Sequence, residues 1–197
     1  MMGVLLGLTT ALGSVNAAVL AIGRGLGAVC MAGMVVIILL QVFFRYVIGT
    51  ALPWPEEAAR FLMLWAAGLM IATAFRRGGF VSIDMLVRLL PARMASGLSL
   101  VLLGLSLVIL VVAIGISWGD VTGIGGRFET DSLKVPMSLD GGPWAKVPRA
   151  WQMASMLVGL TMMISVCLEL MLRNLIGLFG GADRLPAIPD TVTMGAE

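Results

Sequence analysis

Three long stretches without a charged residue constrain this chain more than any other feature. They cover 25–44, 94–119 and 150–168, and Val, Ile, Leu and Met make up much of each stretch. A helix of about 20 apolar residues crosses the roughly 30 Å hydrocarbon core of a bilayer. The stretches therefore predict three membrane-spanning helices, near 25–44, 94–117 and 150–172.

A fourth span begins inside a charged segment. Only 15 uncharged residues lie between Arg60 and Arg76, which is too few to cross a bilayer alone. If the helix starts at Pro55, a residue favoured in the first helical turn, it reaches Phe75 and is long enough. The sequence thus predicts an all-α integral membrane protein with four transmembrane helices, the second near 55–75, in a membrane domain over 25–175.

The composition agrees with a membrane protein and excludes several kinds of chemistry. Charged residues make up 12% of the chain and there is no His, whereas about a quarter of a typical soluble domain is charged. Without His, bis-His haem, most zinc sites and Ser-His-Asp catalysis are excluded. We expect no catalytic residue, metal or cofactor in this chain, and no enzyme activity. The net charge of +2 gives no indication of a nucleic-acid partner.

The segment 1–24 is apolar but does not fit a secretory signal peptide. A signal peptide has positive charge before its apolar stretch, whereas the first charge here is Arg24. We expect an N-terminal extension that either lies on the membrane or lengthens the first helix. Cys30 and Cys167 fall inside predicted spans and are expected to be small apolar core residues.

Arginine placement predicts the orientation. The short loop between the second and third spans holds four Arg against Asp84 alone, and positive residues in short loops stay cytoplasmic. Both termini, including the tail 176–197, are then cytoplasmic. The cytoplasmic basic residues would be seven: Arg24, Arg76, Arg77, Arg88, Arg93, Arg173 and Arg184. The outward ones would be six: Arg45, Arg60, Arg127, Lys134, Lys146 and Arg149.

Two connecting segments have a character of their own. Within 81–90, apolar residues fall on one helical face while Asp84 and Arg88 form an i,i+4 pair on another. This pattern indicates a short interfacial amphipathic helix between the second and third spans, with a plain connector as the alternative. The segment 118–149 is rich in Gly, Pro and charges of both signs. We expect it to be an outward loop with little regular structure. It either contacts a partner or is simply a long connection without a function of its own.

A charged cluster surrounds the start of the second span. Arg45 closes the first helix, and Trp54, Glu56, Glu57 and Arg60 follow at the same surface. Carboxylates near a helix N-terminus are stabilised by its dipole, and Glu56 stands four residues before Arg60. Arg45 is expected to reach one of the two Glu. The cluster is either a staple between two helices or a patch that also contacts a partner.

The middles of the four spans are uncharged. Glu169 lies near the inner end of the last span, where it can pair with Arg173. Transport sites usually need ionisable or broken-helix features at the membrane midplane. Glycines such as Gly104 and Gly115 suggest close helix packing instead. The chain is therefore interpreted as a subunit of a larger membrane assembly.

The charged motifs, in order, resemble the small membrane subunit (DctQ type) of tripartite ATP-independent periplasmic (TRAP) transporters. The resemblance covers about 25–117 and consists of three motifs: an apolar helix ending in Gln-Val-x-x-Arg-Tyr, a Trp-x-Glu-Glu hairpin, and Arg-Arg-Gly-Gly before Ile-x-Asp. Their residues here are Gln41, Val42, Arg45, Tyr46, Trp54, Glu56, Glu57, Arg76, Arg77, Gly78, Gly79, Ile83 and Asp84. The family often has His where this chain has Phe80, so no role of that His carries over.

The resemblance implies a small permease subunit of a bacterial inner membrane that works with a large membrane subunit and a periplasmic substrate-binding protein. It would brace the large subunit and help dock the binding protein during uptake of an organic acid driven by an ion gradient. Sodium would bind in the large subunit, and membrane lipid would surround both. Residues expected in structural or partner contacts are Arg45, Trp54, Glu56, Glu57, Arg60, Arg76, Arg77, Asp84 and Arg88.

Two other functions stay open at the level of the sequence. A self-sufficient small transporter could form from a dimer of four-helix chains, although only Glu169 comes near the interior charge that such exporters use. The chain could also be a non-haem membrane-anchor subunit of another complex. Transport by the chain alone would distinguish the dimeric transporter from the transporter subunit. A haem absorbance spectrum would test the related case of a haem-binding anchor in a respiratory enzyme, which the lack of His argues against.

Overall fold

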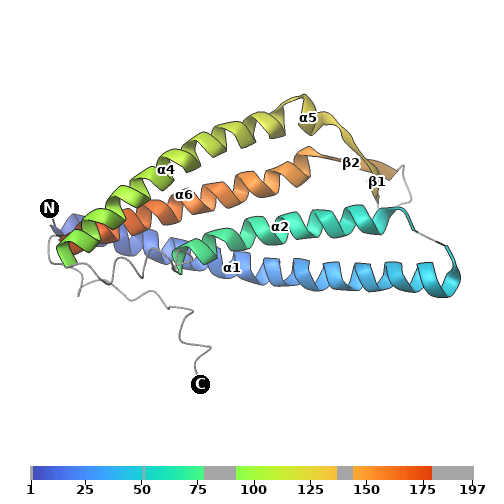
Figure 1. The fold of residues 1–197 in the computed structure, drawn as a ribbon, viewed down its shortest axis with the longest axis horizontal. Coiled ribbons are helices and arrows are strands. Elements are labelled where there is room, and N and C mark those ends of the chain that lie inside the picture. Colours follow the sequence, from blue (N-terminus) through green and yellow to red (C-terminus); the bar gives the residue numbers. More distant parts are fainter. Residues whose placement is uncertain (1, 51, 78–91, 137–143, 179–197) are drawn as a thin grey trace, which may run out of the picture. The chain divides into compact units, whose positions relative to one another are not determined.

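A computed structural model describes residues 2–50, 52–77, 92–136 and 144–178. Its main elements are four long helices: α1 (Met2–Phe43), α2 (Trp54–Arg76), α4 (Ala92–Thr122) and α6 (Ala150–Leu178) (Figure 1). Each is long and apolar enough to cross a membrane. The prediction of an all-α membrane protein with four spans is confirmed.

The first helix is much longer than a single span requires. With the π-helical turn η1 (Phe44–Ile48), it forms 44 helical residues from Leu5 to Ile48, a length of about 66 Å at about 1.5 Å per residue. The predicted extension 1–24 is helical from Met2 onward and continuous with the first span. The helix stops at Gly49, whose φ of 76° few other residues adopt and whose N–H bonds the carbonyl of Phe44.

The segment 118–149 is more regular than expected. It contains the short helix α5 (Ile124–Arg127) and an antiparallel pair of strands, β1 (Glu129–Pro136) and β2 (Trp144–Pro148). The prediction of little regular structure was wrong, because the composition and length of the segment, on which it rested, do not exclude strands. Pro136 and Pro148 are the last residues of their strands, where a missing N–H is tolerated.

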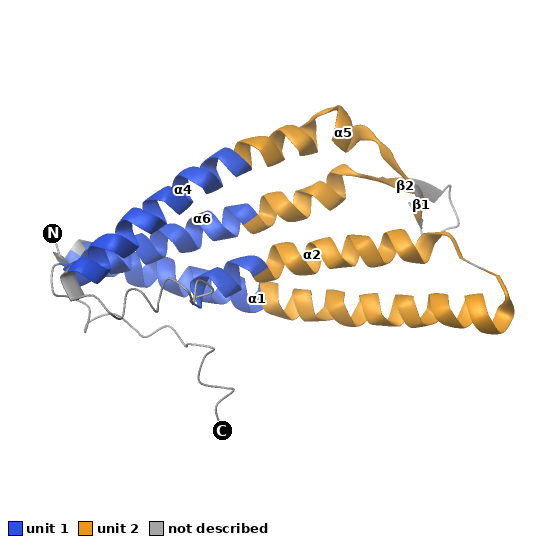
Figure 2. Ribbon diagram, in the orientation of Figure 1, with its two compact units in different colours: residues 1–22, 71–113, 160–197 blue, residues 23–70, 114–159 orange. Residues whose placement is uncertain are grey.

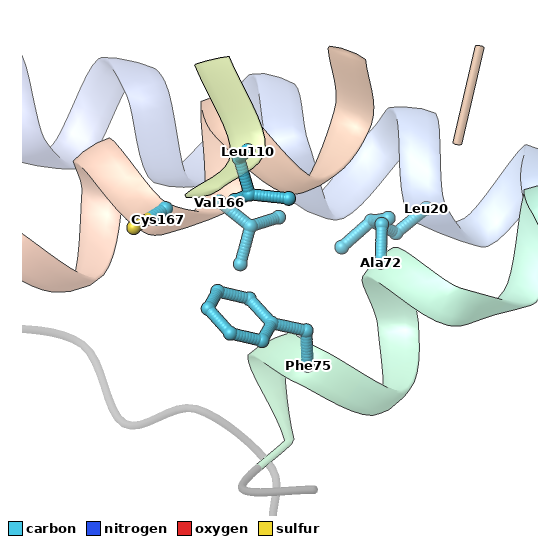
Figure 3. Packing of buried hydrophobic residues seen from close by; sticks show 6 residues of the cluster. All are labelled: Leu20, Ala72, Phe75, Leu110, Val166 and Cys167. Carbon is cyan, nitrogen blue, oxygen red and sulfur yellow. The ribbon is translucent and has the colours of Figure 1, made fainter. Parts of the chain in front are cut away.

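The chain divides into two compact units, and each long helix contributes a segment to both (Figure 2). Unit 1 comprises Met1–Ile22, Ile71–Ala113 and Leu160–Glu197, and unit 2 comprises Gly23–Met70 and Ile114–Gly159. The core of unit 1 combines side chains from all four helices (Figure 3): Leu20, Ala72, Phe75, Leu110, Val166 and Cys167. Cys167 is therefore a buried core residue as expected, whereas Cys30 is only half-buried.

In unit 2, glycine lets helices α2 and α6 approach closely. A Cβ added to Gly68 would lie 2.4 Å from the backbone oxygen of Ser155, and one added to Gly159 would lie 2.6 Å from the oxygen of Gly68. Such small residues allow close backbone approach between membrane helices. The glycines singled out from the sequence behave differently: a Cβ at Gly104 or Gly115 meets no atom of the described residues within 4 Å. The high glycine content of the sequence therefore did not show which glycines lie at a close helix contact.

Other predicted features lie outside the described residues. They are the amphipathic helix over 81–90, with Asp84 and Arg88, and most of the tail 176–197.

Candidate functional site

A carboxylate is buried in the part of α6 that belongs to unit 1. The side chain of Glu169 is 0% exposed, and its Oε1 forms ion pairs with Arg76 at 2.7 Å and Arg173 at 3.0 Å. The two arginine side chains are 11% and 13% exposed. Removing a charge from water is costly unless it is paired and hydrogen-bonded. The pairing explains how α6 tolerates an ionised residue.

Helix α1 completes this cluster. Asn16 donates from Nδ2 to Oε2 of Glu169 at 2.8 Å and to the carbonyl of Ser165 at 3.2 Å. In return, the hydroxyl of Ser165 donates to Oδ1 of Asn16 at 2.7 Å. Both carboxylate oxygens of Glu169 thus accept hydrogen bonds, and α1 is joined to α6 by side chains that lie 149 to 153 positions apart.

A glycine provides the space for the arginines. Arg76 also donates to the carbonyl of Gly13 at 2.9 Å, which links α2 to α1. A Cβ at Gly13 would lie 3.0 Å from Oε1 of Glu169 and 3.2 Å from Nη2 of Arg173. The Nε of Arg76 is buried without a hydrogen-bond partner among the described residues. We call Asn16, Arg76, Glu169 and Arg173 the ion-pair cluster; it connects α1, α2 and α6.

Sequence reasoning found part of this cluster. The predicted pair between Glu169 and Arg173 is confirmed. Arg76 was instead counted as a loop charge, and Asn16 was missed. The available signal was an Asn within the otherwise apolar stretch 1–23 and a Glu inside an apolar span, because polar groups at membrane depth need partners.

A second cluster lies in unit 2, where α2 begins. One oxygen of Glu57, Oε2, accepts hydrogen bonds from the amides of Ser132 at 2.8 Å and Leu133 at 2.7 Å, and from the Ser132 hydroxyl at 2.8 Å. That hydroxyl also lies 2.9 Å from the carbonyl oxygen of Pro53. The β-hairpin therefore crosses from the ends of α4 and α6 to the start of α2 and is fixed there by Glu57 (Figure 1).

The predicted contact between Arg45 and a Glu does not form. Arg45 is exposed in η1, and its side chain makes no ion pair or hydrogen bond with another described residue. Its expected partners have other contacts, since Glu57 binds the hairpin and Glu56 pairs with Arg60 at 3.4 Å. The latter pair is exposed, with side chains 74% and 60% accessible, and is of the i,i+4 kind predicted.

The remaining predicted residues do not belong to one site. Trp54, half-buried, is the first residue of α2 in unit 2. Arg77 follows the end of α2 in unit 1, is half-buried, and bonds the carbonyl of Thr73 through its backbone N–H at 3.2 Å. Of the predicted contact residues, Arg76 thus belongs to the ion-pair cluster and Glu57 to the cluster at the start of α2. Within the described residues, no group of three His, Cys, Asp or Glu could hold a metal ion.

The four spans differ in how much of each is covered. The most apolar windows of α1 and α4 are each 6% buried, compared with 33% for α2 and 28% for α6. On α4, the exposed residues Val101, Leu105, Val108 and Val112 share one helical face. This face must be covered by lipid or by another membrane protein.

Comparison with known proteins points to one family. Residues 34–177, well over half of the chain, match the family model described as tripartite ATP-independent periplasmic transporters, DctQ component. Searches of the curated proteins and of the solved structures found no match. The match includes the C-terminal part of α1, the helices α2, α4 and α6, the hairpin and Glu169, so the chain belongs to the DctQ family, the small membrane subunits of TRAP transporters.

Proposed function

We propose that this TRAP transporter small permease subunit braces the large membrane subunit and helps the periplasmic substrate-binding protein dock. The observation that carries this proposal is the uneven burial of the spans, since the most apolar windows of α1 and α4 are each only 6% buried. An apolar helix face that no other described residue covers is suited to pack against a larger membrane protein. Such packing would hold the large subunit in a fixed position while its transport elements move.

The ion-pair cluster supports a structural role over a transport pathway. A substrate or ion pathway through a membrane needs polar groups that a solute can reach. Glu169 is fully buried and is engaged by Asn16, Arg76 and Arg173. A carboxylate held in this way stabilises helix packing and is poorly placed to bind a passing solute.

The proposed orientation places the hairpin in the periplasm and both termini in the cytoplasm. The hairpin then lies on the periplasmic side, from which a soluble binding protein would approach. The proposed substrate is an organic acid, and uptake is coupled to a sodium gradient through a site in the large subunit. The family is a transporter component rather than an enzyme, and no cofactor is proposed for this chain.

Reconstitution with omission of each component tests the proposal. The chain, its large membrane partner and its binding protein are placed in proteoliposomes, and uptake of labelled carboxylic acids is measured with an inward sodium gradient. We expect uptake with all three components and none when this chain is left out. Equal uptake without the chain would contradict the bracing role. Uptake by the chain alone would instead favour a self-sufficient dimeric transporter.

A further inference from the structure

Two lysines stand directly opposite each other in the β-hairpin. In the register of β1 and β2, Lys134 pairs with Lys146, and both side chains are exposed. Directly opposite residues of an antiparallel pair project from the same face, and like charges at such positions destabilise the pairing. The hairpin therefore carries an unfavourable charge pair that an acidic group from outside would relieve.

The face that these lysines occupy is exposed, whereas the opposite face of the hairpin is covered. In β2, Val147 is 7% exposed and its carbonyl accepts a hydrogen bond from the buried hydroxyl of Thr130 at 2.8 Å. Side chains of successive strand residues point to opposite faces. Since Val147 lies on the covered face, Lys146 and its neighbour Lys134 lie on the uncovered one.

Further positive charge lies at the base of the hairpin. Arg127 and Arg149 are both exposed, and the N–H of Arg149 bonds the carbonyl of Phe128 at 2.8 Å. Neither arginine nor either lysine forms an ion pair with another described side chain. Glu129 is also exposed at this base, opposite Pro148. The lysine pair is thus the part of the hairpin where charge of one sign is most concentrated.

Glu57 holds the lysines in place. The strand register shifts between Glu129 and Lys134, and the amides of Ser132 and Leu133 within that irregular stretch bind the Glu57 carboxylate. The position of Lys134 therefore depends on a contact with α2, outside the hairpin itself. A recognition group held in this way loses less conformational entropy when it binds.

We propose that the Lys134–Lys146 pair is a docking site for acidic side chains on the soluble substrate-binding protein, with Glu57 as its positioning residue. The proposal rests on the proposed function. A lipid headgroup is the less suitable partner, because other residues, at the ends of the neighbouring helices, are suited to the lipid interface. Exposed Trp118 and Trp151, both 61% accessible at the ends of α4 and α6, are the residues suited to the lipid interface.

The test uses the complex of this chain with its large subunit in nanodiscs and measures association and dissociation of the binding protein. In low salt, K134Q/K146Q should associate about tenfold more slowly than wild type, because complementary charge accelerates encounter. The difference should shrink in high salt, where charges are screened. K134R/K146R keeps both charges and should associate at the wild-type rate.

A second variant tests the role of Glu57. E57A keeps the lysines but removes the carboxylate that binds the Ser132 and Leu133 amides, so dissociation should become faster in low salt, and E57A should have no further effect when K134Q/K146Q is already present. E56A is the matched control, since Glu56 pairs only weakly with Arg60 at the surface. Dissociation that E57A accelerates equally with and without the two lysines would contradict the positioning role.

The outcomes separate this inference from the proposed function. Docking on the wild-type complex with unchanged association in K134Q/K146Q overturns the lysine site alone. A wild-type complex that never binds the binding protein contradicts both. Loss of bound anionic lipid from K134Q/K146Q, with docking unchanged, would assign the lysines to the membrane and overturn the proposal.

Discussion

Glu169 is the residue on which the packing of unit 1 most depends. Its carboxylate receives hydrogen bonds from three side chains on three helices: Asn16, Arg76 and Arg173. A buried ion pair adds little net stability compared with a well-packed apolar replacement, but losing one partner leaves the others uncompensated. Glu169 therefore should not be replaceable on its own.

We expect E169Q to lower the free energy of unfolding by about 3 kcal/mol, because Arg76 and Arg173 would remain buried beside a neutral amide. Unfolding in mixed detergent micelles, followed by circular dichroism, measures the change. E56Q is the control, since it removes a carboxylate from the exposed pair with Arg60 and should cost about 0.5 kcal/mol or less. Equal stability of E169Q and wild type would contradict the role of the ion-pair cluster.

At this scale the sequence reveals local pairs better than distant ones. The i,i+4 spacing predicted the contacts of Glu56 with Arg60 and of Glu169 with Arg173, and both form. The contacts of Glu169 with Asn16 and Arg76 join residues 153 and 93 positions apart. Spacing along one helix carries no information on such pairs.

The close approach of α2 and α6 in unit 2 is the clearest feature at the scale of elements. The backbones meet where Gly68 and Gly159 leave no room for a Cβ. The obstacle at Gly68 is the backbone oxygen of Ser155, which no side-chain rotation can move. The two helices would have to separate to accommodate any larger residue.

G68A should therefore destabilise the protein by about 2 kcal/mol, as overpacking of a close contact does. Unfolding in mixed detergent micelles, followed by circular dichroism, measures this change as well. G115A on α4 is the matched control, because a Cβ there meets nothing within 4 Å and should be neutral or slightly stabilising through helix propensity. If G68A and G115A had the same stability, the close crossing of α2 and α6 would be wrong.

Hydropathy predicted the four long helices, but it gave no indication of the β-hairpin. An apolar stretch of about 20 residues has few structures available in lipid other than a helix. The hairpin has no such constraint, and its regular structure depends on Glu57 binding the amides of Ser132 and Leu133. Because Glu57 lies 75 positions before Ser132, composition of the segment 118–149 could not indicate this contact.

For the whole molecule, orientation is the first question, because it decides which side the hairpin serves. Arg76 is one of the loop charges from which the orientation is predicted, but in the structure it pairs with Glu169. Reversing the charges of Arg76 and Arg77 to test the orientation would therefore break the ion-pair cluster as well. Labelling is a cleaner test than charge reversal.

We expect the hairpin to be periplasmic. In a background with Cys30 and Cys167 replaced by Ala, Lys134→Cys should react with a membrane-impermeant maleimide in intact cells with a permeable outer membrane. Arg184→Cys, in the tail, should react only after the inner membrane is opened. The reverse pattern of labelling would show that the proposed orientation is inverted.

The central claim is that this chain acts as one part of a transporter, with its α1 and α4 faces covered by a larger subunit. Affinity purification of the tagged chain from its native membrane, in a detergent that preserves complexes, tests it most directly. We predict that a much larger membrane protein with many spans is recovered with the chain in a fixed ratio. Recovery of the chain alone, or only with a second copy of itself, would contradict the claim.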